Sequence, residues 1–326
     1  MPINWLIKSI RAACLFFCIL FISSCSNTGN NKSNLHLGFM PNVTHATALV
    51  GIEKNFFRDE LGKDTDFKPI HFIVGNSIID AFITNQIDAA YVGPGPYINA
   101  VYRNIPIQFL SNAANGGTLL VGTTKLPLPD GARIAVPQYG NTQDLILRSY
   151  LKKNNLLDKV KIIALPPQDT GTAFFTMSID AACLPEPWGT ILIEKRIRAS
   201  HDLPLQILVN EKSILNNGEY PVTVLIVNKK FAQEHPDLTR KLLVAHNKSN
   251  AFISNNPSEA IEITRESISR ISKKDIKVDI IAASFKRCQF KNNLDLNILK
   301  EFKTIAIIAG YYRKGFQGKA SENNIN

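Results

Sequence analysis

The chain has 326 residues, of which 45% are apolar and 20% are charged. This length is sufficient for two compact lobes with separate cores, and this composition excludes an intrinsically disordered chain. The formal net charge is +10, but lysine and arginine form only short clusters, such as Lys229-Lys230 and Lys273-Lys274. Because nucleic-acid binding requires a clustered basic surface, we expect no nucleic-acid partner.

The first 24 residues have the pattern of a signal peptide. Lys8 and Arg11 precede the apolar run 12–22, which is too short to span a bilayer and has the length of a signal-peptide core. The run is followed by Ser23-Ser24-Cys25, which resembles a bacterial lipobox. We therefore expect a lipid anchor on Cys25 and a flexible tether over residues 25–34. An ordinary secretory peptide followed by a chance cysteine is the alternative.

Beyond the tether, short apolar runs alternate with helical patterns, which favours βαβ units and mostly parallel sheets. Strands are predicted at 35–40, 69–74, 89–92 and 107–110, and helices at 45–60, 78–84 and 97–102. The order restarts with strands at 133–136, 160–165 and 181–184 and helices at 141–154, 172–177 and from 186 onward. A strand at 223–228 then precedes helices at 237–254, 258–271, 276–287 and 294–310.

The two halves of this pattern repeat one another. A shift of 92 residues places the Ile-Asp-Ala-Ala segment 87–90 on the identical segment 179–182, within the same predicted elements. We expect one lobe from residues 35–115 with 224–314, a second lobe from residues 116–223, and a disordered tail over 315–326. The return of the chain to the first lobe gives two crossings, which predicts a hinge.

No catalytic motif is present. The sequence lacks G-x-S-x-G, H-E-x-x-H, a P-loop and C-x-x-C, and its six histidines are scattered at spacings unlike those of a metal site. We therefore expect no enzyme, no catalytic residue, no metal site and no cofactor. Asp88 and Asp180 precede strands in both repeats, so we expect turn or capping roles for them. Cys183 and Cys288 fall in different predicted lobes, so we expect free thiols.

Five predicted strand-to-helix turns are rich in small and polar residues. Because ligands of open α/β sheets bind at the carboxyl ends of strands, where helix N-termini offer free N–H groups, these turns favour a small oxyanion. Simple helix capping is the alternative for each turn taken alone. Tyr97 and Trp188 follow two proline-rich turns and are candidates to flank the ligand, and packing at the interface between the lobes is the alternative for Trp188. The other candidate ligand residues in these turns are Asn42, Thr44, His45, Asn76, Ser77, Gly95, Pro96, Asn115, Gly116, Gly117, Asn141, Thr142 and Gln143.

Several segments together resemble the periplasmic binding proteins of nitrate-, sulfonate- and taurine-type ABC importers. They include Gly38-Phe39-Met40-Pro41, residues 87–96, residues 140–144 and Glu186-Pro187-Trp188. The resemblance implies an α/β, two-lobed type II periplasmic-binding-protein fold, with two doubly wound mixed sheets joined by a two-strand hinge. It also implies ligand contacts from the same turns and from Glu186. Cys183, which replaces an aromatic residue of many relatives, and residues 170–178 depart from the family pattern.

The implied function is that of a lipid-anchored solute-binding protein on the periplasmic or extracellular side of a bacterial membrane. The expected partners are a small anionic ligand (an aliphatic sulfonate, taurine or a nitrate-like ion) and the permease and ATPase of an ABC importer. The protein itself is expected to be a monomer. The alternatives are a binding protein for a pyrimidine thiamine precursor or a phosphonate, a sensory receptor, and an enzyme of the same fold. That enzyme needs a cysteine-rich iron motif that the sequence lacks.

Overall fold

The computed structural model describes residues 33–123, 126–194 and 204–312. The predicted signal peptide, the predicted lipidation site Cys25, nearly all of the predicted tether and the predicted tail over 315–326 lie outside these residues. By its internal contacts the chain divides into residues 1–33 and 34–326, and apart from Ser33 every described residue belongs to the second unit. Within the described ranges, no helix combines the length and the apolar character that crossing a membrane requires.

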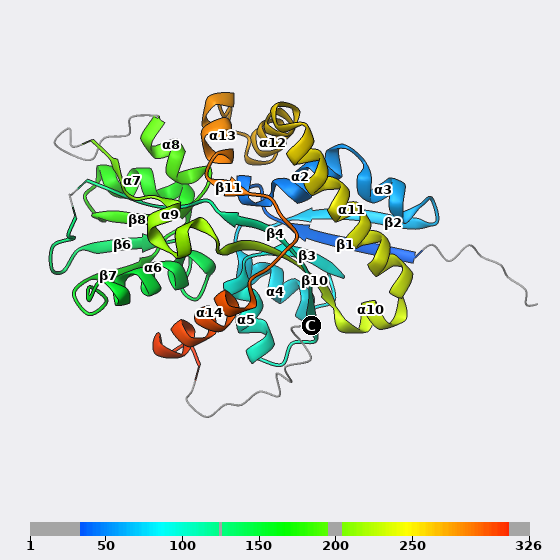
Figure 1. Cartoon of the computed structure of the whole chain (residues 1–326), viewed down its shortest axis with the longest axis horizontal. Helices are drawn as coiled ribbons and strands as arrows, with labels where there is room; N and C mark the ends of the chain where they lie inside the picture. Colours follow the sequence, from blue (N-terminus) through cyan, green and yellow to red (C-terminus); the bar gives the residue numbers. More distant parts are fainter. Residues whose placement is uncertain (1–32, 124–125, 195–203, 313–326) are drawn as a thin grey trace, which may run out of the picture. The chain divides into compact units, whose positions relative to one another are not determined.

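The first sheet has the strand order β11-β4-β10-β3-β1-β2 (Figure 1). β1 is parallel to β3, with Leu37 opposite Ala89, whereas β10 is antiparallel to both β3 and β4. The strands are β1 (Ser33–Phe39), β2 (Thr65–His71), β3 (Ala89–Val92), β4 (Ile107–Gly116), β10 (Pro221–Asn228) and β11 (Cys288–Gln289). The helices between them are η1 (Val43–His45), α2 (Ala46–Glu53), α3 (Phe56–Leu61), α4 (Gly75–Ile83) and α5 (Pro94–Tyr102).

The second sheet has the order β7-β6-β8-β5-β9. β6 is parallel to β7 and β8, and β5 is antiparallel to β8 and β9. The strands are β5 (Thr118–Gly122), β6 (Arg133–Val136), β7 (Lys161–Ala164), β8 (Ala181–Pro185) and β9 (Gln206–Val209). The helices are α6 (Thr142–Lys153), η2 (Pro167–Asp169), α7 (Thr170–Phe175), α8 (Trp188–Glu194), α9 (Glu211–Ile214) and η4 (Asn216–Gly218). The expected α/β fold with two mixed sheets is therefore confirmed.

The repeated Ile-Asp-Ala-Ala segment has the same structural role in both sheets. Asp88 precedes β3, and its Oδ2 accepts the backbone N–H of His36 in the neighbouring parallel strand at 2.8 Å. Asp180 precedes β8, and its Oδ2 accepts the backbone N–H of Arg133 at 2.7 Å. Each aspartate thus joins the start of its own strand to the adjacent parallel strand, at the middle of β1 for Asp88 and at the first residue of β6 for Asp180, which is a structural role.

Two connections carry the chain between the sheets. The first leads from β4 to β5 through Gly116 and Gly117, whose φ angles are 74° and 65°. A Cβ on Gly116 would lie 2.6 Å from the carbonyl oxygen of Arg287, so only glycine fits this crossing without rearrangement. The second leads from β9 to β10, so the chain crosses twice between the sheets, and the hinge at these crossings stays a prediction.

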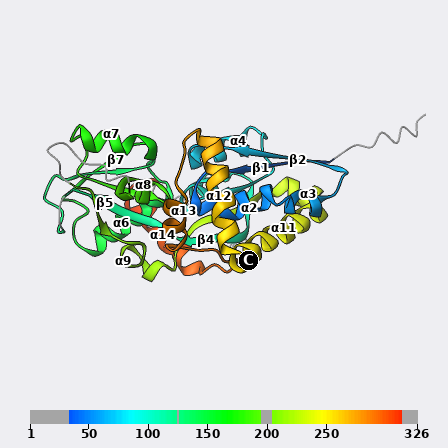
Figure 2. The same ribbon diagram turned by 90° about the horizontal axis from the view of Figure 1, so that it is seen from above.

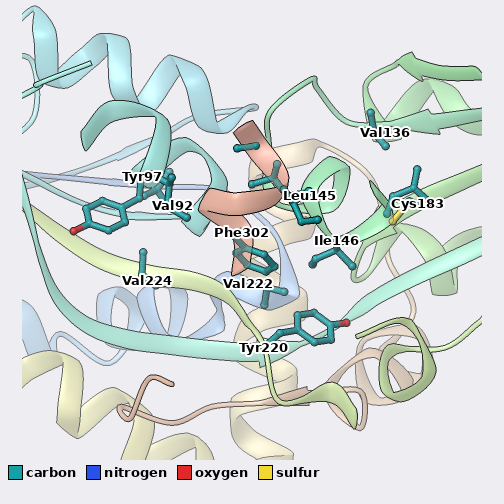
Figure 3. Close-up of a cluster of buried hydrophobic side chains, with 14 of the residues drawn as sticks. Val92, Tyr97, Val136, Leu145, Ile146, Cys183, Tyr220, Val222, Val224 and Phe302 are labelled. Atoms are coloured by element: carbon teal, nitrogen blue, oxygen red, sulfur yellow. The ribbon is translucent and has the colours of Figure 1, made fainter. Parts of the chain in front are cut away.

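The C-terminal helices cover elements of the first sheet and also contact the second. They are α10 (Lys229–Glu234), α11 (Pro236–Asn255), α12 (Pro257–Ser272), α13 (Val278–Phe285) and α14 (Leu296–Ile308). α11 and α12 pack beside α2, as both views show (Figures 1 and 2). α14 packs against α5 and α6, so its apolar side belongs to a core that includes side chains from both sheets (Figure 3).

Some predicted elements differ from the structure. The helix predicted over 45–60 is two helices, α2 and α3, because Asn55 adopts a left-handed conformation with φ 58° between them. The strand predicted to end at residue 110 continues to Gly116. Its second half contains polar residues that are nonetheless buried, since Asn112 bonds to Asn115 and to the carbonyl of Lys291. Cys183 and Cys288 lie in different sheets and are free thiols, as predicted.

Candidate functional site

A cavity of about 310 Å³ lies where loops from the two sheets face each other. Its wall includes the loops that follow β1, β2 and β3 of the first sheet and β6, β7 and β8 of the second. Side chains at the end of α12 complete it. The cavity therefore opens at the carboxyl ends of strands, which is where α/β folds bind their ligands.

The loop after β1 contributes Asn42, Thr44 and His45. His45 is 1% exposed, and burial lowers its pKa to about 3, so the imidazole is neutral. Its Nδ1 lies 3.3 Å from the backbone N–H of Met40 and accepts a hydrogen bond from it. This bond assigns the ring proton to Nε2 and fixes the ring in the cavity wall.

Helices α4 and α5 begin at the cavity. Their N-cap residues, Val74 and Gly93, make no side-chain cap hydrogen bond. The first-turn N–H groups of α4 therefore have no capping side chain to satisfy them, and the positive end of the helix dipole lies at the cavity wall. In α5 the backbone N–H of Gly95 donates to Thr142 Oγ1 at 3.2 Å, which joins α5 to α6.

The N-terminus of α6 supplies a set of linked amide side chains. Asn141 Oδ1 accepts the backbone N–H of Asp144 at 2.9 Å, which caps the helix. Its amide nitrogen donates to Gln143 Oε1 at 3.2 Å, and the Gln143 amide in turn donates to Thr118 Oγ1 at 3.4 Å. Asn141, Thr142 and Gln143 all line the cavity, so a ligand there meets polar groups that are already held in place.

Two buried polar atoms of the wall have no hydrogen-bond partner within the described structure. They are Gln138 Oε1, in the loop after β6, and Ser272 Oγ, at the end of α12. A buried polar atom without a partner costs about 1–3 kcal/mol. A hydrogen bond to these two atoms from a ligand or from water therefore stabilises the protein.

The charge of the wall suits an anion. Among the described residues that line the cavity, none is an aspartate or a glutamate, and Lys274 is the only lysine or arginine. Lys274 Nζ lies 5.7 Å from the centroid of the Trp188 ring. Among all residues that the structure describes, no group of three or more His, Cys, Asp or Glu side chains is arranged to hold a metal ion. The wall thus provides positive potential, neutral donors and apolar surface.

Comparison with known protein families shows which family this chain belongs to. Residues 28–268, which include both crossings and most of the cavity wall, match the NMT1-like family. The chain belongs to the NMT1-like family.

Two curated proteins are similar to this NMT1-like chain. A putative aliphatic sulfonates-binding protein of Bacillus subtilis (strain 168) is 24% identical over 227 residues, which are 66% of this chain. The taurine-binding periplasmic protein of Escherichia coli (strain K12) is 27% identical over 198 residues, which are 59% of this chain. The matches span 64% and 58% of these relatives' own lengths. Both are named as binding proteins, in line with the expectation that the chain is not an enzyme.

Solved structures share the fold of this NMT1-like chain. The alkanesulfonate-binding protein of Xanthomonas axonopodis pv. citri, bound to MOPS, superimposes with a TM-score of 0.68 at 15% identity. That likeness covers 86% of this chain and 93% of the other. The periplasmic nitrate-binding protein of Synechocystis PCC 6803 gives a TM-score of 0.71 at 17% identity, covering 90% of this chain and 86% of the other. These likenesses show a periplasmic-binding-protein fold.

Half of the sequence-predicted ligand residues lie on the cavity wall. They are Asn42, Thr44, His45, Pro96, Asn141, Thr142, Gln143 and Trp188. Trp188 also joins the two sides of the cavity, because its Nε1 donates to Asn42 Oδ1 at 3.1 Å.

The other predicted ligand residues are near the cavity or behind it. Asn76 and Ser77 follow the wall residue Gly75 in the first turn of α4, and Gly95 contacts α6. Tyr97 is 3% exposed and lies in the apolar core, with its ring 6.4 Å from that of Phe109 (Figure 3). Tyr97 therefore packs in the core and does not line the cavity, contrary to the prediction that it flanks the ligand.

Four predicted residues lie at the crossing between the sheets. Asn115 and Gly116 end β4, and Gly117 connects it to β5. Glu186 is fully buried beside it, where its carboxylate accepts hydrogen bonds from Thr190 and Ser284 and pairs with Arg287 at 3.0 Å. Burial raises the Glu186 pKa, while these partners lower it. These residues lie at or beside the crossing between the sheets, and none of them lines the cavity.

Sequence reasoning missed several wall residues. Gln138 and Gln168 come shortly after predicted strands, so their position at the carboxyl ends of β6 and β7 was a usable signal. Ser272 and Lys274 had no comparable signal, since α12 is far away in sequence and reaches the cavity only through tertiary packing.

Proposed function

We propose that this chain is the solute-binding component of an ABC importer and that its cavity binds a small organic anion, such as an aliphatic sulfonate or taurine. The observation that carries this proposal is the cavity wall, which combines Lys274, neutral amide groups and uncapped helix N-termini with no described carboxylate. The binding of sulfonates and taurine by the curated relatives, as their names state, supports the same ligand class.

The size and lining of the cavity favour an organic anion over nitrate. Its volume of about 310 Å³ is within the roughly 300–1,000 Å³ typical of sites for small organic molecules. Met40, Ile73 and Trp188 line it and offer apolar surface that a bare inorganic ion would leave uncovered. An alkyl chain against these side chains removes apolar area from water and adds to the affinity.

Binding is coupled to closure of the cavity in this proposal. Three hydrogen bonds join its two sides: Val43 N–H to the Glu186 carbonyl, Trp188 to Asn42, and Gly95 to Thr142. The lobes over 35–115 with 224–314 and over 116–223 separate around the two crossings to admit the solute. A ligand that contacts both sides favours the closed state, which the permease of the importer then recognises.

A thermal-shift screen followed by calorimetry tests the ligand class. The panel contains 1-butanesulfonate, taurine, nitrate, methylphosphonate and an aminopyrimidine. Because a ligand that binds only the folded protein raises its Tm, we expect the largest increase with 1-butanesulfonate or taurine. No increase with any sulfonate, confirmed by calorimetry, would contradict the proposal.

A pyrimidine ligand is the second candidate. The Trp188 ring offers a stacking surface, and the amides of Gln138 and Gln168 offer paired donors and acceptors for a heterocycle. In the same screen, an increase in Tm with the aminopyrimidine alone would favour this candidate over the sulfonate.

We also propose that the protein is anchored to the membrane through lipid on Cys25, on the extracytoplasmic side. The support is the sequence pattern of an apolar run followed by Ser23-Ser24-Cys25. Expression of the full chain in a bacterium is expected to place the wild type in the membrane fraction and to release Cys25→Ser into the soluble extracytoplasmic fraction. Equal fractionation of both proteins would rule the anchor out.

A further inference from the structure

The C-terminal segment contacts both helices that meet at the cavity. α14 packs against α5 and against α6. Phe302 of α14 is fully buried in the same apolar cluster as Val92 of β3 and Leu145 of α6 (Figure 3). Two tyrosines, Tyr311 and Tyr312, follow this helix after Ala309 and Gly310.

Tyr311 is bonded to the first turn of α6. Its hydroxyl donates to Oδ2 of Asp144, a side chain that is fully buried. The same Oδ2 accepts the backbone N–H of Gly140 at 2.8 Å, and Oδ1 accepts Nε–H of Arg148 at 2.8 Å. Burial and the neighbouring carboxylate raise the pKa of Tyr311, so its hydroxyl stays protonated and remains a donor.

Asp144 is the residue that shapes the turn before α6. Its backbone N–H bonds to Asn141, and its carboxylate holds the N–H of Gly140, whose φ is 71°. The three residues enclosed by these two bonds, 141–143, are the wall residues of α6. The orientation of the Asp144 carboxylate therefore determines the shape of this part of the wall.

Tyr312 holds the other helix. Its ring stacks on that of Tyr102, the last residue of α5, with centroids 3.9 Å apart and planes 8° apart. The opposite end of α5 lies at the cavity, where Gly93 and Pro96 line the wall. Consecutive residues thus fasten α6 and α5, the two helices joined by the bond between Gly95 and Thr142.

We propose that Tyr311 is a positioning residue for ligand binding, which acts through Asp144 to hold residues 140–143 in their binding conformation, while Tyr312 anchors the same segment to α5. This inference deepens the proposed function and rests on it for the ligand. The tyrosine hydroxyl stabilises one carboxylate orientation, and the carboxylate in turn stabilises the turn that carries Asn141, Thr142 and Gln143. Loss of the hydroxyl leaves the ring in place beside Arg148, whose guanidinium lies 5.4 Å from its centroid.

The test compares Tyr311→Phe with Tyr312→Phe in the full chain. Hydrogen exchange of the backbone amides of residues 140–144 is measured without ligand, and the affinity for 1-butanesulfonate is measured by calorimetry. For Tyr311→Phe we expect exchange at 140–144 to rise about tenfold, the scale of losing one hydrogen bond to a charged group, and Kd to rise at least about threefold. Tyr312→Phe keeps its stacking on Tyr102 and does not touch Asp144, so both quantities are expected to stay at the wild-type value.

A second variant, at Asp144, tests whether Tyr311 acts through this carboxylate. Asp144→Asn, with Tyr311 intact, is expected to raise exchange at the same amides, and adding Tyr311→Phe to it is expected to have no further effect. Wild-type exchange at 140–144 in Tyr311→Phe would overturn the positioning role whatever the protein binds. Raised exchange with an unchanged Kd would overturn it as well. Raised exchange in a protein whose wild type binds no member of the ligand panel would contradict the proposed function alone.

Discussion

Lys274 is the single lysine or arginine among the described residues of the cavity wall, and it reaches the wall from the end of α12. A positive charge in the wall of a partly solvated site contributes about 1 kcal/mol to the binding of an anion there. We expect Lys274→Gln to weaken the binding of 1-butanesulfonate about fivefold in calorimetry.

The neighbouring residue provides a matched control for this prediction. Lys273 carries the same charge and does not line the cavity, so Lys273→Gln is expected to leave the affinity unchanged. Raising the salt concentration from 50 to 300 mM is expected to weaken binding by the wild type more than by Lys274→Gln, because salt screens the charge. Equal effects of the two substitutions would assign the loss to net charge and not to the site.

Asn141 has two roles that one substitution can separate. Its side chain caps α6, and it also lines the cavity. Asparagine and aspartate cap helices about equally well, but aspartate places a carboxylate next to a bound anion. We expect Asn141→Asp to leave the free energy of unfolding within about 0.5 kcal/mol of the wild type and to weaken sulfonate binding by about 1–3 kcal/mol. Denaturation curves and calorimetry on the same sample check both values, and unaltered affinity would place the anion elsewhere.

At the scale of elements, the strands that are short apolar runs between turn residues could be predicted from the sequence. β3 and β6 have the predicted bounds, and the repeated Ile-Asp-Ala-Ala segment correctly placed the third strand of each half. Prediction from apolar runs was wrong where tertiary contacts determine the bounds of a strand. The second half of β4 contains buried polar residues such as Asn112, whose amide nitrogen donates to the carbonyl of Lys291, 179 positions later.

The same contrast between local patterns and tertiary contacts explains which residues of the candidate site could be predicted. Residues in turns directly after strands, such as Asn42 and Asn141, could be placed at the cavity because strand ends converge in α/β folds. Tyr97 could not be separated from them, since helical spacing alone does not say which side of α5 faces the core. Lys274 could not be found, because the docking of α12 next to Trp188 depends on packing between distant segments.

The first crossing between the sheets depends on glycine. Gly116 has φ 74°, and a Cβ there would collide with the backbone of Arg287. We expect Gly116→Ala to lower the free energy of unfolding by about 3 kcal/mol, because left-handed strain of about 1–2 kcal/mol adds to the collision. Gly131→Ala is the control, since Gly131 has φ 82° with no atom within 4 Å of an added Cβ. Gly131→Ala is expected to lower the free energy of unfolding by the left-handed strain alone. Equal losses for the two variants in urea denaturation would show that the collision with Arg287 costs nothing.

For the whole molecule, two buried histidines predict a loss of stability in mild acid. Burial lowers the pKa of His45 to about 3 and that of His246 to about 4, below the ordinary value of 6.5. The unfolded chain therefore binds protons that the folded chain excludes, and stability present above pH 6.5 is lost as the pH falls towards the folded-state values. Between pH 7 and pH 5 each histidine is expected to cost about 2 kcal/mol.

Denaturation at the two pH values measures this loss. His246→Gln removes one of the two titrating groups, so its stability is expected to fall by about 2 kcal/mol less than that of the wild type over the same range. Tyr91, whose hydroxyl lies 2.9 Å from His246 Nδ1, keeps a possible partner in the glutamine amide. A wild-type stability that does not change between pH 7 and pH 5 would show that neither imidazole is excluded from protonation.

Closure of the whole molecule depends on how closely α5 and α6 approach each other. A Cβ on Gly95 would lie 2.7 Å from the backbone carbon of Asn141 and from the backbone nitrogen of Thr142, so this approach requires glycine. Gly95 is inside a helix, where alanine is the better helix former, so the substitution is not expected to disrupt α5 itself. Gly95→Ala should therefore prevent closure without unfolding either sheet.

Small-angle scattering with and without 1-butanesulfonate measures the expected consequence. In the wild type, saturating ligand is expected to reduce the radius of gyration, because a solute that contacts both sides of the cavity stabilises the closed state. In Gly95→Ala the radius is expected to exceed that of the ligand-bound wild type and to remain there when ligand is added, with Kd raised at least about tenfold because cross-cavity contacts are lost. A wild-type radius that ligand does not change would contradict closure, and a variant that compacts normally would show that α5 and α6 need not touch for the solute to be held.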